Sequence, residues 1–276
     1  MKKWVILILS LVLVGCGTKF VYNNIDWIVI EYVDDFVELT DEQETLISNT
    51  LERLTAWHKA HELPNYIEHL NQLIELDPST LTLDDIQQQE TKLQAHTQRL
   101  LHHLAPDILL LAKQLSDEQV EELMDSIRVR HTRYKKKYQK LSEQEIRAHY
   151  GKKLTENIED WLGPLSREQK QWIAEWTSEL YVTSYDWIDH QTKMRVEIST
   201  LLSRRSDERY FVPHFEQLMF DPTSFYAQAL QQKIDHNRAT AHQYLVKIIN
   251  SVSPKQTRHY RQELKDWRDI ALEIHN

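Results

Sequence analysis

Glycine, cysteine and long apolar runs are scarce in this chain. Only 4 of its 276 residues are glycine and 1 is cysteine. β-Rich folds need glycine in their turns, so the scarcity disfavours them, whereas the frequent Leu, Gln, Glu, Lys and Arg are good helix formers. A transmembrane helix needs roughly 20 apolar residues in a row, and no segment is that long and apolar. The composition therefore favours an all-α protein without a spanning helix.

The start of the chain has the layout of a secretory signal. Two lysines precede an apolar run over 4–14, which closes on Leu13, Val14, Gly15 and Cys16. A charged start, a short apolar centre and a small residue before a cleavage point are typical of signal peptides. The pattern resembles the lipobox of bacterial lipoproteins, whose cysteine is lipidated and becomes the mature N-terminus. An uncleaved N-terminal anchor or a chance lone cysteine is the alternative.

The lipobox resemblance implies how the chain is held at a membrane. A signal peptide over 1–15 would be removed, and Cys16 would carry a diacylglyceryl thioether and an acylated amino group. More than one acyl chain gives stable anchoring, and no other cofactor is expected. Gly17 is not the aspartate that marks retention in the inner membrane, so the address is the outer membrane, facing the periplasm. The tether 16–23 spans under about 30 Å when extended, which keeps the folded body close to the membrane.

The charge balance limits the class of partner. The chain carries 33 basic and 42 acidic residues, a formal net charge of −9. Removal of residues 1–15 takes two lysines away and makes the mature chain more acidic. Such a balance disfavours nucleic acid and general adhesion to anionic lipid. A protein or polymer of the cell envelope is the expected partner.

Helix starts carry a recurring motif, in which an apolar residue is followed by Ser or Thr and then by Gln three positions further on. The hydroxyl can accept from the third helical amide while the Gln reaches back to the cap amide, which makes a capping box. The copies stand at 39–43, 115–119, 165–169 and 252–256, with variants at Thr82/Asp85 and Ser142/Glu145. Their separations are unequal, which indicates repeated capping chemistry and not a sequence repeat.

The apolar spacing, the caps and the prolines predict an elongated multi-helix bundle of about ten helices. The expected helices are 24–38, 41–63, 65–76, 83–104, 107–114, 117–140, 143–162, 167–203, 207–220, 223–250 and 254–274. Pro106 is expected to break or kink the helices around it. Gly163-Pro164 is the best boundary between an N-terminal region, 24–162, and a C-terminal region, 163–276. One elongated domain and two packed halves both fit the chain length.

Two histidines are the candidate metal ligands. His58 and His61 lie three apart on an expected helix, with Glu62 adjacent, and could supply two ligands to Zn or Cu. The competing interpretation is that they lie near a helix C-terminus, whose dipole favours them. The bend at Pro64 is expected to bring Trp57, Leu63 and Tyr66 together as a packed corner. No Gly-x-Ser-x-Gly, P-loop or Gly-x-Gly-x-x-Gly motif occurs, so no catalytic residue is assigned and a non-enzyme is expected.

One basic stretch opposes the overall acidic charge. It contains Arg128, Arg130, Arg133, Lys135, Lys136, Lys137 and Lys140 and no acid. The stretch could contact anionic head groups or another anionic polymer. Alternatively, these bases complement the dipole at the C-terminal end of a helix whose first turns are acidic.

Several segments resemble a family of proteobacterial lipoproteins of unknown function. They are 22–27, 32–35 running into 39–43, Trp57-His58 with 62–66, 115–119 and 161–166. The resemblance implies an α-helical envelope lipoprotein and carries over no catalytic residue. The Leu-Thr-x-x-Gln string at 39–43 and its near-copies is also similar to the motifs of small periplasmic stress chaperones.

Three functions follow as hypotheses. The first is a non-enzymatic, lipid-anchored envelope protein that binds or scaffolds another envelope component. The second is a chaperone-like periplasmic stress protein that uses an apolar helical concavity. The third is an envelope enzyme or metal binder centred on His58, His61 and Glu62.

Overall fold

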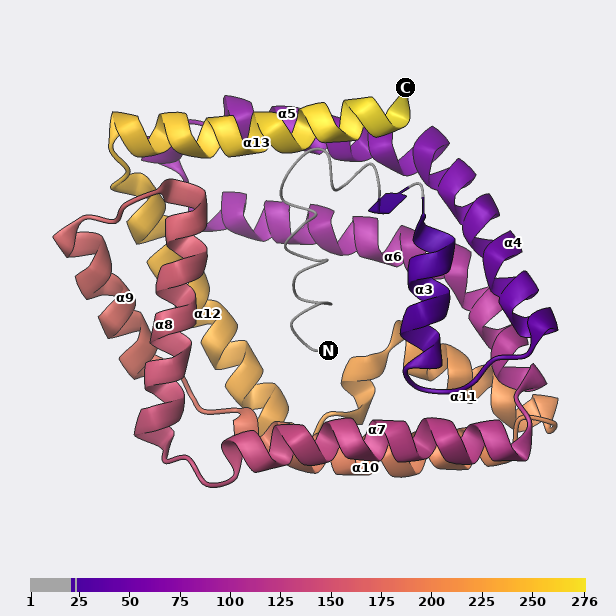
Figure 1. Ribbon diagram of the computed structural model, residues 1–276. Helices are drawn as coiled ribbons and strands as arrows, with labels where there is room; N and C mark the ends of the chain where they lie inside the picture. Colours follow the sequence, from indigo (N-terminus) through magenta and orange to yellow (C-terminus); the bar gives the residue numbers. More distant parts are fainter. Residues whose placement is uncertain (1–20, 23) are drawn as a thin grey trace.

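The computed structural model describes residues 21–22 and 24–276, and this part of the chain is all-α, without a strand (Figure 1). The predicted fold class is thereby confirmed. None of the helices in the described ranges is long and apolar enough to cross a membrane. Leu13, Val14, Gly15 and Cys16 lie outside the described residues.

The α-helices are α3 (Ile25–Asp34), α4 (Asp41–Trp57), α5 (Leu63–Glu75), α6 (Leu83–Gln114), α7 (Asp117–Tyr138), α8 (Glu143–Leu162), α9 (Arg167–Glu179), α10 (Ser184–Ser203), α11 (Glu208–Phe220), α12 (Gln228–Asn250) and α13 (Pro254–His275). A π-helical turn, η1 (His58–Glu62), joins α4 to α5. Short 3₁₀ turns, η2 (Pro78–Thr80) and η3 (Pro222–Phe225), precede α6 and α12.

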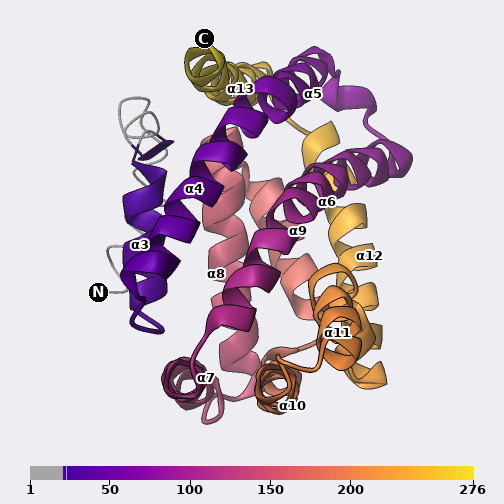
Figure 2. The ribbon, with the colours of Figure 1, turned by 90° about the vertical axis from the view of Figure 1, so that its right-hand side faces the viewer.

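The helices form the sides of an open frame (Figure 1). Helices α5 and α13 lie side by side along one edge, and α7 and α10 lie side by side along the opposite edge. Helix α4 forms one flank, α8, α9 and α12 form the other, and α6 runs between the flanks (Figures 1 and 2). Burial follows this plan, because the buried apolar residues fall into separate clusters instead of one central core.

The two parts of the chain repeat one set of helix contacts. Helix α3 packs on α4 as α8 packs on α9, and α6 packs on α4 as α12 packs on α9. Helix α5 packs on α13 as α10 packs on α7, so the last helix of each part lies against the other part. In the second part of the chain, α11 and α12 together correspond to α6 of the first part. A break at η3 separates these two helices. The repeat thus exists in three dimensions, although the sequence shows no regular period.

All six predicted capping boxes are present, at the starts of α4, α6, α7, α8, α9 and α13. The four capping glutamines also join in two pairs, which the sequence did not predict. Gln43 and Gln119 exchange amide hydrogen bonds of 3.0 and 2.7 Å, and Gln169 and Gln256 exchange bonds of 3.4 and 2.9 Å. Each pair ties together two helix starts that are far apart in the sequence.

Two expected helix breaks are wrong, and one unexpected break occurs. The helix passes through Pro64 by widening into η1, and Pro106 lies inside the continuous α6. The expected helix 167–203 is instead interrupted over 180–183. The backbone groups freed there find side-chain partners, since Asn237 bonds both N and O of Tyr181 and Lys233 bonds O of Val182. Tertiary hydrogen bonds therefore overrule local helix propensity at this point.

The predicted boundary at Gly163-Pro164 coincides with a sharp turn. Gly163 ends α8 with φ 71° and ψ −161°, a conformation that is open almost only to glycine. The helix pairs α5–α13 and α7–α10 join the regions on either side of this turn. The division into 24–162 and 163–276 stays a prediction.

Candidate functional site

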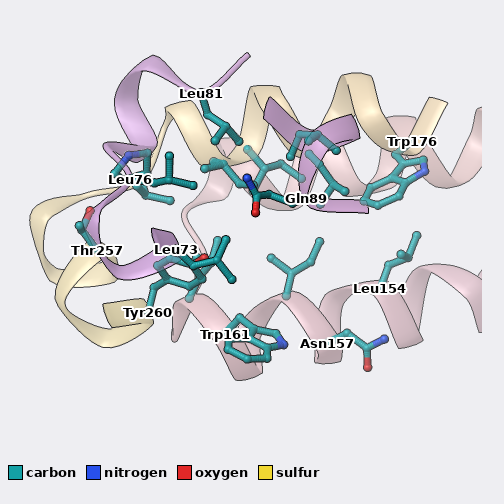
Figure 3. Close-up of a pocket in the computed structure, with 18 residues that line it drawn as sticks. Leu73, Leu76, Leu81, Gln89, Leu154, Asn157, Trp161, Trp176, Thr257 and Tyr260 are labelled. Atoms are coloured by element: carbon teal, nitrogen blue, oxygen red, sulfur yellow. The ribbon is translucent and has the colours of Figure 1, made fainter. Parts of the chain in front are cut away.

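An apolar pocket of about 400 Å³ lies where α5, η2, α6, α8, α9, α12 and α13 meet. Most of its 18 lining residues are aliphatic or aromatic, and the others are the polar residues Gln89, Asn157 and Thr257. Figure 3 shows Gln89 facing Trp161 and Asn157 of α8 across the hollow. Small-molecule sites occupy roughly 300–1,000 Å³ and combine apolar walls with a few polar groups, so this pocket has the size and chemistry of such a site.

The pocket has a buried inner wall and an exposed rim. Ile248 is fully buried and Trp176 is 5% exposed, and the Trp176 ring lies parallel to that of Tyr244 with centroids 6.1 Å apart. Trp161, in contrast, is 42% exposed, and Asn157 is exposed beside it. The hollow can therefore be reached from the α8 side.

The wall presents hydrogen-bond donors without acceptors. The buried Nε1 of Trp176 has no partner, and Nε2 of Gln89 has no acceptor among the described residues, since its amide is bonded only through Oε1. Burial raises the pKa of Tyr260, so this lining phenol keeps its proton at neutral pH. An apolar molecule with an acceptor group would complement such a wall.

The equivalent position in the other part of the fold is filled. By the matching contacts, α5 corresponds to α10 and α13 corresponds to α7. Likewise, α6 corresponds to α11, and α12 corresponds to the end of α6. A buried cluster occupies that position, with Phe211 fully buried and Phe215 5% exposed, packed on Leu115, Leu201 and Leu202. The helix arrangement can therefore be closed by side chains, and the pocket is a property of its own lining residues.

A buried polar network borders the pocket on the α5–α6 side. Its anchor is Glu62, which is 1% exposed and accepts hydrogen bonds from Nε and Nη2 of Arg99 and from Nδ2 of Asn65 at 3.2 Å. Burial alone would raise the pKa of Glu62, but the hydrogen bonds and charge of Arg99 hold it below its usual value. The carboxylate thus stays ionised and fixes the guanidinium.

The network continues through two histidines to the pocket wall. Nη2 of Arg99 lies 2.6 Å from Nδ1 of His96, Nε2 of His96 lies 3.2 Å from Nδ1 of His69, and Nε2 of His69 lies 2.8 Å from Oε1 of Gln89. Nδ1 of His96 also lies 3.3 Å from Oε2 of Glu62, so this nitrogen has both a donor, Arg99, and an acceptor beside it. Burial lowers the pKa of His69, which favours its neutral form.

The π-helical turn explains how Glu62 reaches this place. Pro64 lacks an N–H, and its ring would clash with the carbonyl four residues earlier. Widening into η1 keeps the chain helical, with Leu63 at φ −58° and ψ −41°. The chain therefore passes from α4 into α5 without a loop, and Glu62 is buried beside Asn65. Such π-turns are frequent at functional sites.

The predicted candidate metal ligands lie on this same turn but do not converge. Nδ1 of His58 lies 3.1 Å from the hydroxyl of Tyr22, and His61 lies beside the ring of Trp57. No group of three or more His, Cys, Asp or Glu side chains in the described ranges is arranged to hold a metal ion. The expected corner is formed in part, because Leu63 packs with Tyr66 while Trp57 stacks on His103 with centroids 3.7 Å apart.

The predicted basic stretch lies on α7 and divides into two groups. Arg130 is engaged just after α3, where it pairs with Asp35 at 3.6 Å and lies 3.6 Å over the Phe36 ring. Arg128 pairs with Asp125 at 3.1 Å. The second group is exposed and has no ion pair with any described residue; it consists of Arg133, Lys135, Lys136, Lys137 and Lys140. Only this second group is available to an external anion.

Sequence reasoning did not find the pocket or its network. Gln89 and His69 carry no local motif, and Glu62 was considered only as a neighbour of His58 and His61. The signal that did exist was the proline at 64 within a continuous apolar pattern, which is compatible with a π-turn.

The fold and the pocket define an all-α protein built from two helix sets with matching contacts, and the apolar pocket lies in the second of these sets. The chain belongs to a family of unknown function (DUF6279), whose model matches residues 35–231. The match begins just after α3, ends within α12 and includes the α5, α6, α8 and α9 walls of the pocket. No curated protein and no solved structure matches the chain.

Proposed function

We propose that this protein is a non-enzymatic, lipid-anchored component of the cell envelope that binds an apolar or amphiphilic envelope molecule in the α5–α6–α8–α12–α13 pocket. The observation that carries the proposal is the apolar hollow of about 400 Å³, at a position that the other half of the fold fills with Phe211 and Phe215.

The anchor is supported by the sequence. The order of charge, apolar run, Gly15 and Cys16 resembles a lipobox, and a short tether would hold the frame beside the bilayer from which an amphiphile could come. The outer membrane is the proposed address, with the folded body in the periplasm. The exposed bases at the end of α7, from Arg133 to Lys140, are proposed to face anionic head groups or an envelope polymer.

A pocket-filling variant tests the proposal. Ile158→Trp on α8 places a large ring in the hollow, and Val196→Trp, at a site that is 60% exposed on α10, is the matched control. An environment-sensitive apolar fluorophore should bind the parent chain and the control and should be displaced by membrane lipids. Binding should fall at least tenfold for Ile158→Trp, with helical content unchanged. Equal binding by all three chains would contradict the proposal.

A further inference from the structure

The pocket extends along α8. Leu154, Ile158 and Leu162 line it at successive turns of this helix, because residues four apart lie on one face of a helix. Eight residues rise about 12 Å along a helix axis, and Figure 3 shows Leu154, Asn157 and Trp161 in a row beside the hollow. A ligand that fills the pocket therefore lies along α8.

One end of the pocket has a supported wall. Leu154 packs against the buried cluster that contains Trp176. The Trp176 ring lies parallel to the ring of Tyr244, with centroids 6.1 Å apart, and the Tyr244 hydroxyl donates a hydrogen bond of 2.6 Å to Glu179. Tyr260 lines the opposite end of the hollow (Figure 3). A ligand that reaches Trp176 thus meets a ring that is held in place by its own neighbours.

The volume of the pocket matches one hydrocarbon chain. An engineered cavity of about 150 Å³ with Leu, Ile and Phe walls binds benzene, which has six carbon atoms. In the same proportion, the volume of about 400 Å³ found here holds about 16 carbon atoms. None of the described residues that line the pocket carries a charge, so an ionised head group would gain no ion pair by entering. Such a head group stays in water, beside the exposed Asn157 and Trp161 at the rim.

We infer that the pocket selects single-chain amphiphiles by the length of the chain, with an upper limit of about 16 carbon atoms. The inference rests on the proposed function, since it names the ligand class of the same pocket. Each buried methylene strengthens binding about fourfold, so the affinity rises with chain length until the pocket is full and then stays constant. A diacyl lipid binds more weakly than a fatty acid, because its second chain finds no room.

A series of saturated fatty acids tests this assignment. Their lengths bracket the limit, from about 8 to about 20 carbon atoms, and each displaces an environment-sensitive apolar fluorophore from the full-length chain in a fluorinated surfactant. The dissociation constant should fall about fourfold for each methylene and should stop falling near 16 carbon atoms. Fatty alcohols should show the same break in the series. A diacyl phospholipid with chains of equal length should bind at least about tenfold more weakly.

Substitutions at one position should move the break in opposite directions. Leu154→Ala removes three carbon atoms from the wall and should move it to about 19, whereas Leu154→Phe adds three and should move it to about 13. Leu73→Ala, on the α5 wall, should repeat the effect of Leu154→Ala. The matched controls are Leu93→Ala and Leu93→Phe on α6, where the side chain is 59% exposed, and they should leave the break unchanged. Circular dichroism checks that each variant keeps its helical content.

The outcomes separate the inference from the proposed function. Affinity that still rises at about 20 carbon atoms, or a break that neither the Leu154 variants nor Leu73→Ala move, would overturn selection by length and leave apolar binding intact. Equal binding of the diacyl phospholipid would also overturn it. A fluorophore that does not bind the parent chain would contradict the proposed function itself.

Discussion

The paired capping glutamines should stabilise the frame far more than ordinary helix caps. Gln169 is 1% exposed, its Oε1 accepts from the Ser166 amide and from Gln256, and its Nε2 donates to Ser251 at 3.1 Å and to Gln256 at 3.4 Å. Gln169→Leu keeps a similar volume but removes these four bonds. At about 1 kcal/mol for each bond, with buried partners left unsatisfied, the free energy of unfolding should fall by about 4 kcal/mol.

Urea unfolding followed by circular dichroism measures this change. Gln262→Leu is the matched control, because this exposed glutamine makes only a local bond to Asp266 and its loss should cost less than about 0.5 kcal/mol. The double variant Gln169→Leu/Gln256→Leu should cost about 1–2 kcal/mol less than the sum of the single changes, since the two amides share bonds. Gln43→Leu, in the other pair, should instead add to Gln169→Leu.

The reasoning is refuted if Gln169→Leu costs no more than Gln262→Leu. It is also refuted if the Gln169 and Gln256 changes are strictly additive, because the two side chains would then act as separate caps. In both cases the shared amide pair would not join the helix starts energetically.

Four further predictions follow from the fold, the network and the sequence. Gly163→Ala should lower the free energy of unfolding by about 1–3 kcal/mol, because φ is 71° there and a side chain strains that conformation; an unchanged melting temperature would contradict this. The pKa of His69 lies below its ordinary value of 6.5 and that of Glu62 below 4.5, so the unfolded chain takes up protons first as the pH falls. Stability should therefore decrease below about pH 6.5 and again in the acid range, and His69→Leu should flatten the upper part of a stability–pH curve; a rise in stability on acidification would be the opposite sign. Cys16→Ala should abolish labelling with radioactive palmitate and move the protein out of the membrane fraction, and unchanged fractionation would exclude the anchor. Reversal of Lys135, Lys136 and Lys137 to Glu should weaken sedimentation with anionic vesicles at low salt, with reversal of Lys152 and Lys153, which pair with Glu156, as the control; equal loss in both would speak for net charge alone.

The helices and their starts were accessible to sequence reasoning, because both depend on local interactions. Each of the six predicted pairs of Ser or Thr with Gln, Glu or Asp three residues later forms its capping box. The expected helix breaks at Pro64 and Pro106 are wrong, because a π-turn precedes Pro64 and α6 continues through Pro106. The break over 180–183 depends on Asn237 and Lys233, which lie some fifty residues away in the sequence.

The pocket lay beyond prediction for a different reason. A hollow is defined by what seven elements leave unfilled, and each of its leucines and isoleucines looks like an ordinary core residue. Glu62 appeared as one more acid on an acidic chain. Its role became visible only when Arg99, His96 and His69 were brought to it from α6 and α5.

The pairing of α5 with α13 has a consequence for the order in which the molecule is made. Contacts between these partners join residues 185 to 197 positions apart in the sequence, and contacts of such separation close late and slowly. Nothing can cover α5, or complete the α13 wall of the pocket, until the last residues have been synthesised. A growing chain thus remains open along one edge throughout its synthesis. The protein is proposed to be exported across a membrane. A chain that cannot complete its fold before its last residues are made stays unfolded long enough to be exported.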